Sequence, residues 1–443
     1  MKNFRSRLQA HKWLLSLLVM AVAVSCQKNS FEKPVVVLTA FDPSLPVIID
    51  SFTPDSGGVS TQMLIYGSNF GTDPSKIQVF VNDKAAPVIG STGTIIYAMV
   101  PSRAGTGRVK VMVTNGEQTK ETNSEINFSY IYKPSVGTLA GFKNENNETS
   151  IVDGDIATAQ FEQPYWLCFD NHKNLYLLEE YRGLRFIDSA ATNVKTLFRV
   201  GNGLDRPRTL AFNPTYDTLY ITNDQWSVTG LSTVVATLAD SFTTWSSLIY
   251  NLTTNGSAVQ PQTGDYFYNS YSTGAIFKWD RTNKVSNELF RIGDVNWEFN
   301  IQFAPSGDFA YICVVNQHYI LKSRYNRQTG LLETPVHFVG TRRSAGYKDG
   351  VGTDVLFNEP HQGAFDEFDN FYVCDRVNHV IRKITPEGIV TTFAGRPNDP
   401  GYADGALRDA QFDRPSGIAY DAASGTFYIA DENNARIRTI ITE

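Results

Sequence analysis

Nine side chains of this sequence combine flat aromatic rings with guanidinium, imidazole and amide groups. Aromatic rings offer apolar faces to the C–H groups of sugars, and Arg and Asn supply the few oriented hydrogen bonds that a polar ligand needs. The chemistry predicted is therefore recognition of a polysaccharide, oligosaccharide or similar polar ligand. The nine residues are Tyr165, Trp166, Arg208, Trp226, Tyr271, Trp297, His361, Arg376 and Asn378.

Signals for catalysis are sparse. The sequence contains no G-x-S-x-G and no H-E-x-x-H motif, and its histidines show no ligand spacing. The short apolar segments "LCF", "LAF", "IQF", "GAF" and "IAY" lack convergent carboxylates or imidazoles. We expect no catalytic residue, no metal and no cofactor, and keep as the alternative a metal site formed by His318, His361 and His379.

Length and charge limit the remaining classes. A chain of 443 residues with 42% hydrophobic residues can bury large cores and predicts two or three domains. The 39 Lys and Arg residues against 45 Asp and Glu residues give a mildly acidic protein without long charged runs. This balance argues against a nucleic-acid partner.

The N-terminus is typical of a targeting segment. Basic residues up to Lys12 precede the apolar stretch "WLLSLLVMAVAV" (13–24), which is too short to span a bilayer. The following "VSC" resembles the lipobox of bacterial lipoprotein signals. The resemblance implies a signal peptide over 1–25 and lipidation of Cys26, whereas Ala23, where the lipobox prefers Leu, leaves ordinary signal-peptidase cleavage open.

A linker (26–45) leads into short alternating strands over 46–132, with turns every 8–12 residues, which predict a β-sandwich. The spacing of Ile49, Phe52, Pro54 and Gly57, with "YGSNFG", resembles the IPT/TIG family of immunoglobulin-like domains. Some relatives of this fold bind DNA. This segment has six basic against seven acidic residues, so we expect a spacer without nucleic-acid binding.

From 133 to 443 the chain repeats itself. Asp349-Gly350, Phe357 and Pro360 recur 55 residues later, and an earlier copy begins at Asp153-Gly154. With degenerate copies between, this makes six units of short strands, which predict a six-bladed β-propeller. The motifs "DG…F…P" and "FYIAD…N…IR" resemble the NHL-repeat family, weakly between about 200 and 340. We expect the Asp-Gly pairs to set turns rather than bind calcium.

One strand is out of place. "VGTLAGF" (136–142) resembles the fourth strand "VTTFAGR" (390–396), but no blade precedes it, and the last unit ends at Glu443 without a fourth strand. Pairing of this strand with the last unit would close the ring and remove two exposed sheet edges. We call residues 136–141 the clasp.

If the first strand of each blade is innermost, the blade-to-blade connections and those between second and third strands share one face, which we call the upper face. These connections are long, and all nine candidate residues fall on them or at the strand ends beside them. Loops on a rigid scaffold commonly carry function. Trp166 occupies a position where sibling blades have Gly417 and Thr209, which predicts a stacking platform.

The sequence thus predicts an all-β, lipid-anchored protein with an immunoglobulin-like spacer and a ligand-binding propeller. This layout resembles the surface glycan-binding proteins of polysaccharide utilisation systems. The resemblance implies a non-catalytic outer-membrane protein facing the cell exterior, with an importer and its substrate-binding lipoprotein as partners. The alternatives are a propeller lyase or lactonase and a protein–protein scaffold.

Overall fold

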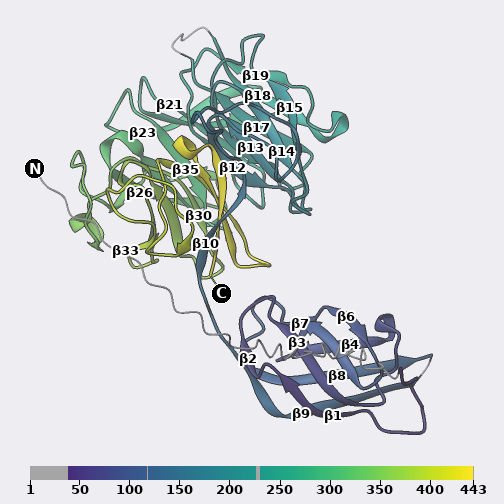
Figure 1. The fold of residues 1–443 in the computed structure, drawn as a ribbon. Helices are drawn as coiled ribbons and strands as arrows, with labels where there is room; N and C mark the ends of the chain where they lie inside the picture. The colour runs from purple at the N-terminus through teal and green to yellow at the C-terminus, as the bar shows by residue number, and fades with distance from the viewer. Residues whose placement is uncertain (1–37, 117, 226–229, 443) are drawn as a thin grey trace, which may run out of the picture.

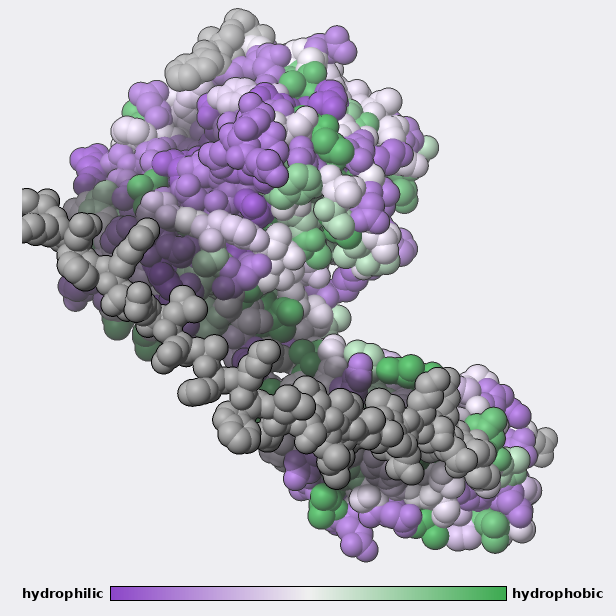
Figure 2. Space-filling model, in the orientation of Figure 1, coloured by the Kyte–Doolittle hydropathy of each residue, from purple (hydrophilic) through white to green (hydrophobic). Residues whose placement is uncertain are grey.

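The computed structural model describes residues 38–116, 118–225 and 230–442. Cys26 and Trp226 lie outside these ranges. The regular secondary structure of the described chain is almost wholly β-strand, and the chain forms two bodies (Figure 1 and Figure 2). No helix in the described ranges is long and apolar enough to cross a membrane. The predicted all-β class, an immunoglobulin-like sandwich followed by a propeller, is confirmed.

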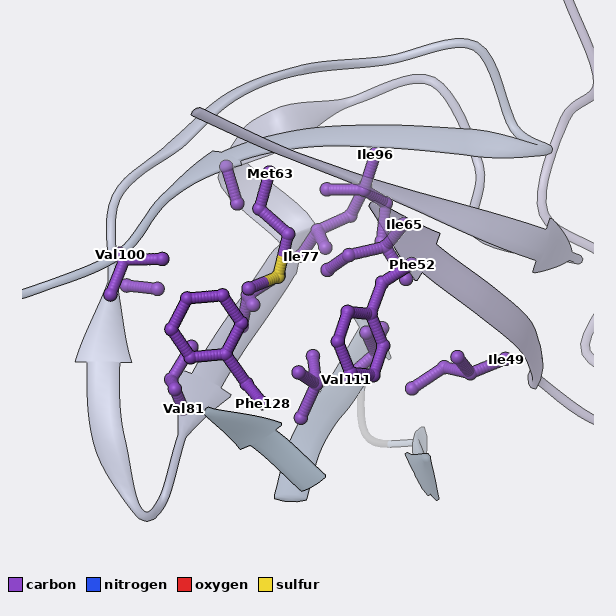
Figure 3. Packing of buried hydrophobic residues seen from close by; sticks show 14 of the residues in the cluster. Ile49, Phe52, Met63, Ile65, Ile77, Val81, Ile96, Val100, Val111 and Phe128 are labelled. Atoms are coloured by element: carbon purple, nitrogen blue, oxygen red, sulfur yellow. The ribbon is translucent and has the colours of Figure 1, made fainter. Parts of the chain in front are cut away.

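The N-terminal body is a sandwich of two sheets. Alternating side chains of both sheets meet in one core, which includes Phe52, Met63, Ile65, Val111 and Phe128 (Figure 3). The first sheet contains β1 (Ile48–Thr53), β3 (Gln62–Ser68), β7 (Ile95–Met99) and β6 (Val88–Ser91). The second contains β2 (Ser56–Gly57), β9 (Gln118–Tyr130), β8 (Gly107–Asn115), β4 (Ile77–Val81) and β5 (Lys84–Ala86).

The C-terminal body is a propeller of six sheets. From the inside outward, blade 1 contains β12 (Pro164–Phe169), β13 (Leu175–Glu179), β14 (Gly183–Ile187), β15 (Asn193–Arg199) and β11 (Gly154–Asp155). Blade 2 contains β16 (Pro207–Phe212), β17 (Thr218–Asn223), β18 (Leu231–Thr237) and β19 (Ser246–Tyr250). Blade 3 contains β20 (Ser257–Val259), β21 (Tyr266–Ser270), β22 (Ala275–Asp280) and β23 (Val285–Arg291).

The second half of the ring follows the same plan. Blade 4 contains β24 (Phe299–Phe303), β25 (Phe309–Val314) and β26 (Tyr319–Asn326), which pairs with β27 (Leu331–Leu332) and β28 (Val336–Val339). Blade 5 contains β30 (Pro360–Phe365), β31 (Phe371–Asp375), β32 (Val380–Ile384), β33 (Ile389–Ala394) and β29 (Gly350–Val351). Blade 6 contains β35 (Pro415–Asp421), β36 (Thr426–Asp431), β37 (Arg436–Ile441), β10 (Ser135–Ala140) and β34 (Gly405–Ala406). Each innermost strand contacts those of both neighbouring blades, so the ring is closed.

The clasp closes the ring as the sequence predicts. Strand β10 pairs antiparallel with β37, with Val136 opposite Ile440, and Figure 1 shows it beside the C-terminal strands. Val136 packs in the core between blades 5 and 6, whereas Ala140 packs in the core between blades 6 and 1. The strand that precedes the first blade therefore completes the last one.

The Asp-Gly pairs support buried arginines. Asp349 accepts a hydrogen bond of 2.7 Å from Arg382, whose other terminal nitrogen lies 2.7 Å from Asp375 at the end of β31. The guanidinium is fully buried and also donates to the backbone carbonyls of Leu356 and Lys348. The same arrangement joins Arg185 to Asp153 and Glu179 in blade 1, and Arg438 to Asp404 and Asp431 in blade 6.

Blades 2 to 4 lack these arginines. By strand register, the equivalent positions are the apolar residues Val234, Phe277 and Leu321. This difference gives a physical reason why the repeat motif is weak in the middle of the propeller.

The sandwich contacts the lower face of the propeller. Arg103 donates to the carbonyl of Ala422 at 2.9 Å and to the carboxylate of Glu367 at 2.7 Å, and Ser102 donates to the carbonyl of Ser424. These partners lie on the turns between first and second strands of blades 5 and 6. The upper face therefore points away from the sandwich.

Candidate ligand-binding site

A pocket of about 550 Å³ opens at the centre of the upper face, and we call it the upper pocket. Its volume is in the range of small-ligand sites, roughly 300–1,000 Å³. Blades 1 to 5 all contribute, through residues at the start of first strands and just after second strands. The lining residues are Tyr165, Glu180, Arg206, Arg208, Asp224, Thr253, Asn255, Tyr271, Ser272, Asn296, Trp297, Glu298, Asn316, Glu359 and Arg376.

Three side chains form a hydrogen-bonded floor. The Tyr165 hydroxyl donates to Glu298 Oε1 at 3.1 Å, and His361 Nε2 lies 2.6 Å from that hydroxyl and 2.9 Å from the same carboxylate oxygen. His361 Nδ1 lies 2.5 Å from the carbonyl of Ser416, which can only accept, so this nitrogen carries a hydrogen. Burial raises the pKa of Tyr165 well above its ordinary value, which keeps the phenol neutral.

Arg208 connects the hydrogen-bonded floor to the side wall of the upper pocket through ion pairs. Its guanidinium is buried, lies 4.6 Å from the centre of the Tyr165 ring and binds the carboxylates of Glu180 and Glu298. Burial alone would raise the pKa of Glu298, but the charges of Arg208 and His361 more than offset it and hold that pKa well below its usual range. The floor therefore holds an ionised carboxylate away from bulk water.

The remaining wall charges are also paired. Arg206 lies 2.7 Å from Glu180 and 3.0 Å from Asp224. Arg376 lies 3.0 Å from Glu359 and 2.8 Å from Glu432. Buried and half-buried charges are stable in proteins when they are paired in this way. The result is a fixed array of donors and acceptors, the arrangement that orients a polar ligand.

Two aromatic rings lie on the wall. Trp297 is 39% exposed and directly precedes Glu298. Tyr271 is half-buried, its hydroxyl donates to the carbonyl of Gln225 at 3.0 Å, and burial raises its pKa to about 12. A ring that presents a free face beside polar groups is suited to stacking on a sugar.

The structure brings together five of the nine predicted residues. Tyr165, Arg208, Tyr271, Trp297 and Arg376 line the upper pocket, and buried His361 supports its floor. Arg208 covers the Tyr165 ring, so of these aromatic rings Trp297 and Tyr271 are the ones left for a ligand. Trp226 lies outside the described residues.

The position of Trp166 corrects the prediction of a stacking platform. The side chain is 2% exposed and packs in the core between blades 1 and 2, where its Nε1 donates to the carbonyl of Leu210 at 3.2 Å. Successive side chains of a strand point in different directions, so Tyr165 reaches the upper pocket and Trp166 does not. The ring fills the space between two blades.

Asn378 and two of the histidines have structural partners instead. Asn378 is buried and donates to Asp375 and to the carbonyl of Gly346. His318 Nδ1 accepts from the backbone N–H of Glu359, and His379 Nδ1 accepts from that of Arg414, each at 3.1 Å. Burial lowers the pKa of both imidazoles, which favours this neutral, accepting form. In the described part of the chain, no group of three or more His, Cys, Asp or Glu is placed to hold a metal ion.

The carboxylates of the upper pocket were not predicted. The inner strands were expected to lack convergent acids, but Glu180, Asp224, Glu298 and Glu359 meet in the upper pocket. The signal was present in the repeat alignment, because Glu180 and Asp224 directly follow second strands and Glu298 and Glu359 directly precede first strands. Arg376 likewise directly follows a second strand, and Trp297 stands one residue before Glu298.

Below the upper pocket, the buried Gln362 amide joins the innermost strands of blades 5, 6 and 1. It accepts from the backbone N–H groups of Leu167 and Ile418 and donates to the carbonyl of Leu167. A separate cavity of about 440 Å³ lies on the lower side and is lined mainly by apolar residues such as Leu210 and Ile301. The two cavities share no lining residue.

Comparisons with known proteins agree with this architecture. Residues 46–130 match the IPT/TIG domain family and residues 412–440 match the NHL repeat. A crystal structure of an auxiliary nutrient binding protein from Bacteroides thetaiotaomicron is 39% identical, with a TM-score of 0.67, over 90% of this chain and 99% of that one. The chain belongs to the same family of IPT/TIG–NHL proteins. Another member, an auxiliary nutrient binding protein from Bacteroides ovatus, is 33% identical with a TM-score of 0.72 over 91% of this chain and 99% of that one.

The family also includes a Bacteroides thetaiotaomicron protein described as a proposed phosphatase, 32% identical with a TM-score of 0.68 over 91% of this chain and 98% of that one. Curated relatives are matched in part only. A chloroplast protein of Arabidopsis thaliana is 26% identical over 322 residues, and the chain spans 26% of its length.

Proposed function

We propose that this protein is a non-catalytic, cell-surface glycan-binding lipoprotein that captures polysaccharide for an outer-membrane uptake system. Two family members are described as auxiliary nutrient binding proteins, which supports a binding role in nutrient uptake. The proposal goes further in three respects: the ligand is a glycan, the protein serves an uptake system, and it lies on the cell surface.

The observation that carries the proposal is the upper pocket itself. It combines a fixed array of paired Arg and Glu side chains with the exposed ring of Trp297 and the half-buried ring of Tyr271. Sugars present hydroxyl groups around apolar C–H faces, so an aromatic ring beside polar groups can bind both. The pocket faces away from the sandwich, and therefore away from the N-terminal end from which an anchor would extend.

Replacement of Trp297 tests the glycan step. Loss of a stacking aromatic typically costs ~2 kcal/mol or more, roughly thirtyfold in affinity, so Trp297→Ala should weaken binding at least about tenfold. Affinity electrophoresis across a polysaccharide panel, followed by calorimetry on the best ligand, measures the change. The matched control is Phe368→Ala, which removes an exposed ring on the lower face. Equal affinities of both variants and the parent would contradict the proposed site.

Anchoring is tested separately. Cys26 carries the lipobox resemblance, so Cys26→Ala should abolish fatty-acid labelling and release the protein from the membrane fraction. Protease accessibility on intact cells then reports whether the anchored protein faces outward. An unlabelled parent protein that still sediments with membranes would rule out the lipid anchor and leave the binding proposal standing.

An enzyme is the second candidate, favoured by the Tyr165–His361–Glu298 cluster and by the relative described as a proposed phosphatase. Against it, both ring nitrogens of His361 have partners and the imidazole is fully buried, so it has no free position from which to exchange a proton with substrate. A stoichiometric divalent metal in the purified protein, or turnover of phosphomonoesters lost in His361→Gln, would favour the enzyme. A protein–protein scaffold would bind no glycan of the panel.

A further inference from the structure

We propose that the upper pocket selects glycans that carry no negative charge and rejects uronates and sulfated or phosphorylated sugars. The proposal rests on the binding function proposed above and names its ligand class. Two features of the pocket support this ligand class. Its charged groups are paired with one another, and its carboxylates keep free hydrogen-bond acceptor positions.

The guanidiniums of the pocket are already bound by carboxylates of the protein. Arg206, Arg208 and Arg376 each bind two carboxylates of the protein. Recognition of a carboxylate or sulfate group by arginine depends on its paired N–H donors. An anionic ligand would have to compete with these protein carboxylates for the guanidiniums.

The cations of the pocket are balanced by carboxylates. In the described ranges, the network that lines and supports the pocket contains five carboxylates and four guanidiniums, and the imidazole of His361, which binds Glu298, is a fifth cation. Its members are Glu180, Asp224, Glu298, Glu359, Glu432, Arg206, Arg208, Arg376 and Arg414. Burial raises the pKa of Asp224, which indicates that bulk water screens this part of the pocket poorly. A negative charge placed beside the wall carboxylates of Glu180 and Asp224 would be repelled by them.

The hydrogen-bonding positions that remain favour a donor. An ionised carboxylate can accept about four hydrogen bonds, so Glu180 and Asp224 keep free lone pairs after binding Arg206 and Arg208. Sugar hydroxyls donate to such oxygens, whereas carboxylate and sulfate groups only accept. A neutral glycan with several hydroxyls, or an amino sugar, therefore fits the chemistry of the wall.

The test compares matched ligands on the full mature protein. Dextran, pullulan, galactan and galactomannan are each presented as hydroxyethyl and carboxymethyl derivatives of equal substitution, so that the two differ in charge and little in size. The hydroxyethyl form of the best ligand should bind at least tenfold more tightly than its carboxymethyl form. The difference should narrow as salt is raised, because salt screens the repulsion.

A variant of a wall carboxylate tests whether the upper pocket causes the preference for uncharged glycans. Asp224→Asn removes one negative charge and keeps an oxygen that can accept from Arg206. It should reduce the ratio of the affinities for the hydroxyethyl and carboxymethyl forms several-fold. Asp83→Asn removes an exposed charge of the sandwich and should change nothing. Equal or tighter binding of a carboxymethyl form, or discrimination unchanged in Asp224→Asn, overturns the inference but leaves glycan binding in place. Absence of binding to every polysaccharide overturns the proposed function and the inference together.

Discussion

Replacing residues 136–140 with a Gly-Ser stretch of equal length should lower the melting temperature of the propeller by roughly 5–15 °C, which corresponds to a loss of about 3–5 kcal/mol. The replacement removes Val136 and Ala140 from the cores on either side of blade 6 and weakens the pairing of β10 with β37. The pairing of β10 with β37 on one side and with β34 on the other joins the first segment of the propeller to its last blade. Differential scanning calorimetry of the full chain measures the change.

The matched control is the same replacement in β19, the outermost strand of blade 2. Strand β19 pairs along one edge, contributes one buried side chain, Ile249, and the partly buried Leu248 to a core, and its replacement leaves the ring closed. A smaller loss is therefore expected. If both replacements lower the melting temperature equally, the effect of the clasp is that of any outer strand and ring closure contributes nothing to stability.

Replacing Arg382 with Met should destabilise the propeller by about 3–5 kcal/mol, because it leaves the carboxylate of Asp375 buried without its partner. Both side chains are fully buried, and Arg382 also stacks over Phe357 and Tyr347. Met keeps much of the volume and removes the charge, so the loss is electrostatic rather than a cavity effect. Urea unfolding followed by tryptophan fluorescence measures it.

Two further variants test whether the lost stability comes from breaking the buried ion pair. Arg291→Met removes the exposed pair with Glu288 and should cost no more than ~1 kcal/mol. The double variant Arg382→Met with Asp375→Leu should recover part of the stability, because replacing a whole buried ion pair with apolar residues is often tolerated. A double variant less stable than Arg382→Met alone would show that Asp375 is held mainly by its bonds to Asn358 and Asn378.

The fold was largely predictable because its signals are local and repeated. Alternating apolar residues predict strands, and copies such as Asp349-Gly350 and Asp404-Gly405 fix how many strands make a blade. The clasp followed from counting strands, and the structure confirms it in the pairing of Val136 with Ile440. The buried arginines were not predicted, because a charged residue in a strand gives no sign of the partner that allows its burial.

The site was predictable only in outline. The repeat alignment places Arg376 and Trp297 at the upper mouth, since equivalent loops of a propeller meet there. The alignment could not show which of the neighbours Tyr165 and Trp166 faces the pocket. It places a residue only to within about one position, and side chains one position apart in a strand point in different directions. The equivalent positions in other blades hold the small residues Gly417 and Thr209, which suggested that the Trp166 ring is not needed for packing. Whether a large ring packs at this position depends on the neighbouring blade, which differs from one position to the next.

The sequence by itself determined the all-β class, the order of the two bodies, the number of blades and the closure of the ring, because each depends on spacing along the chain. The tertiary structure alone decided that Glu180, Asp224, Glu298 and Glu359 meet, and that each is held by an arginine from another part of the chain. Carboxylates tens of residues apart show no mutual relation in sequence. Their charges act on one another only after the blades have brought them into one pocket, where water screens them less than in bulk.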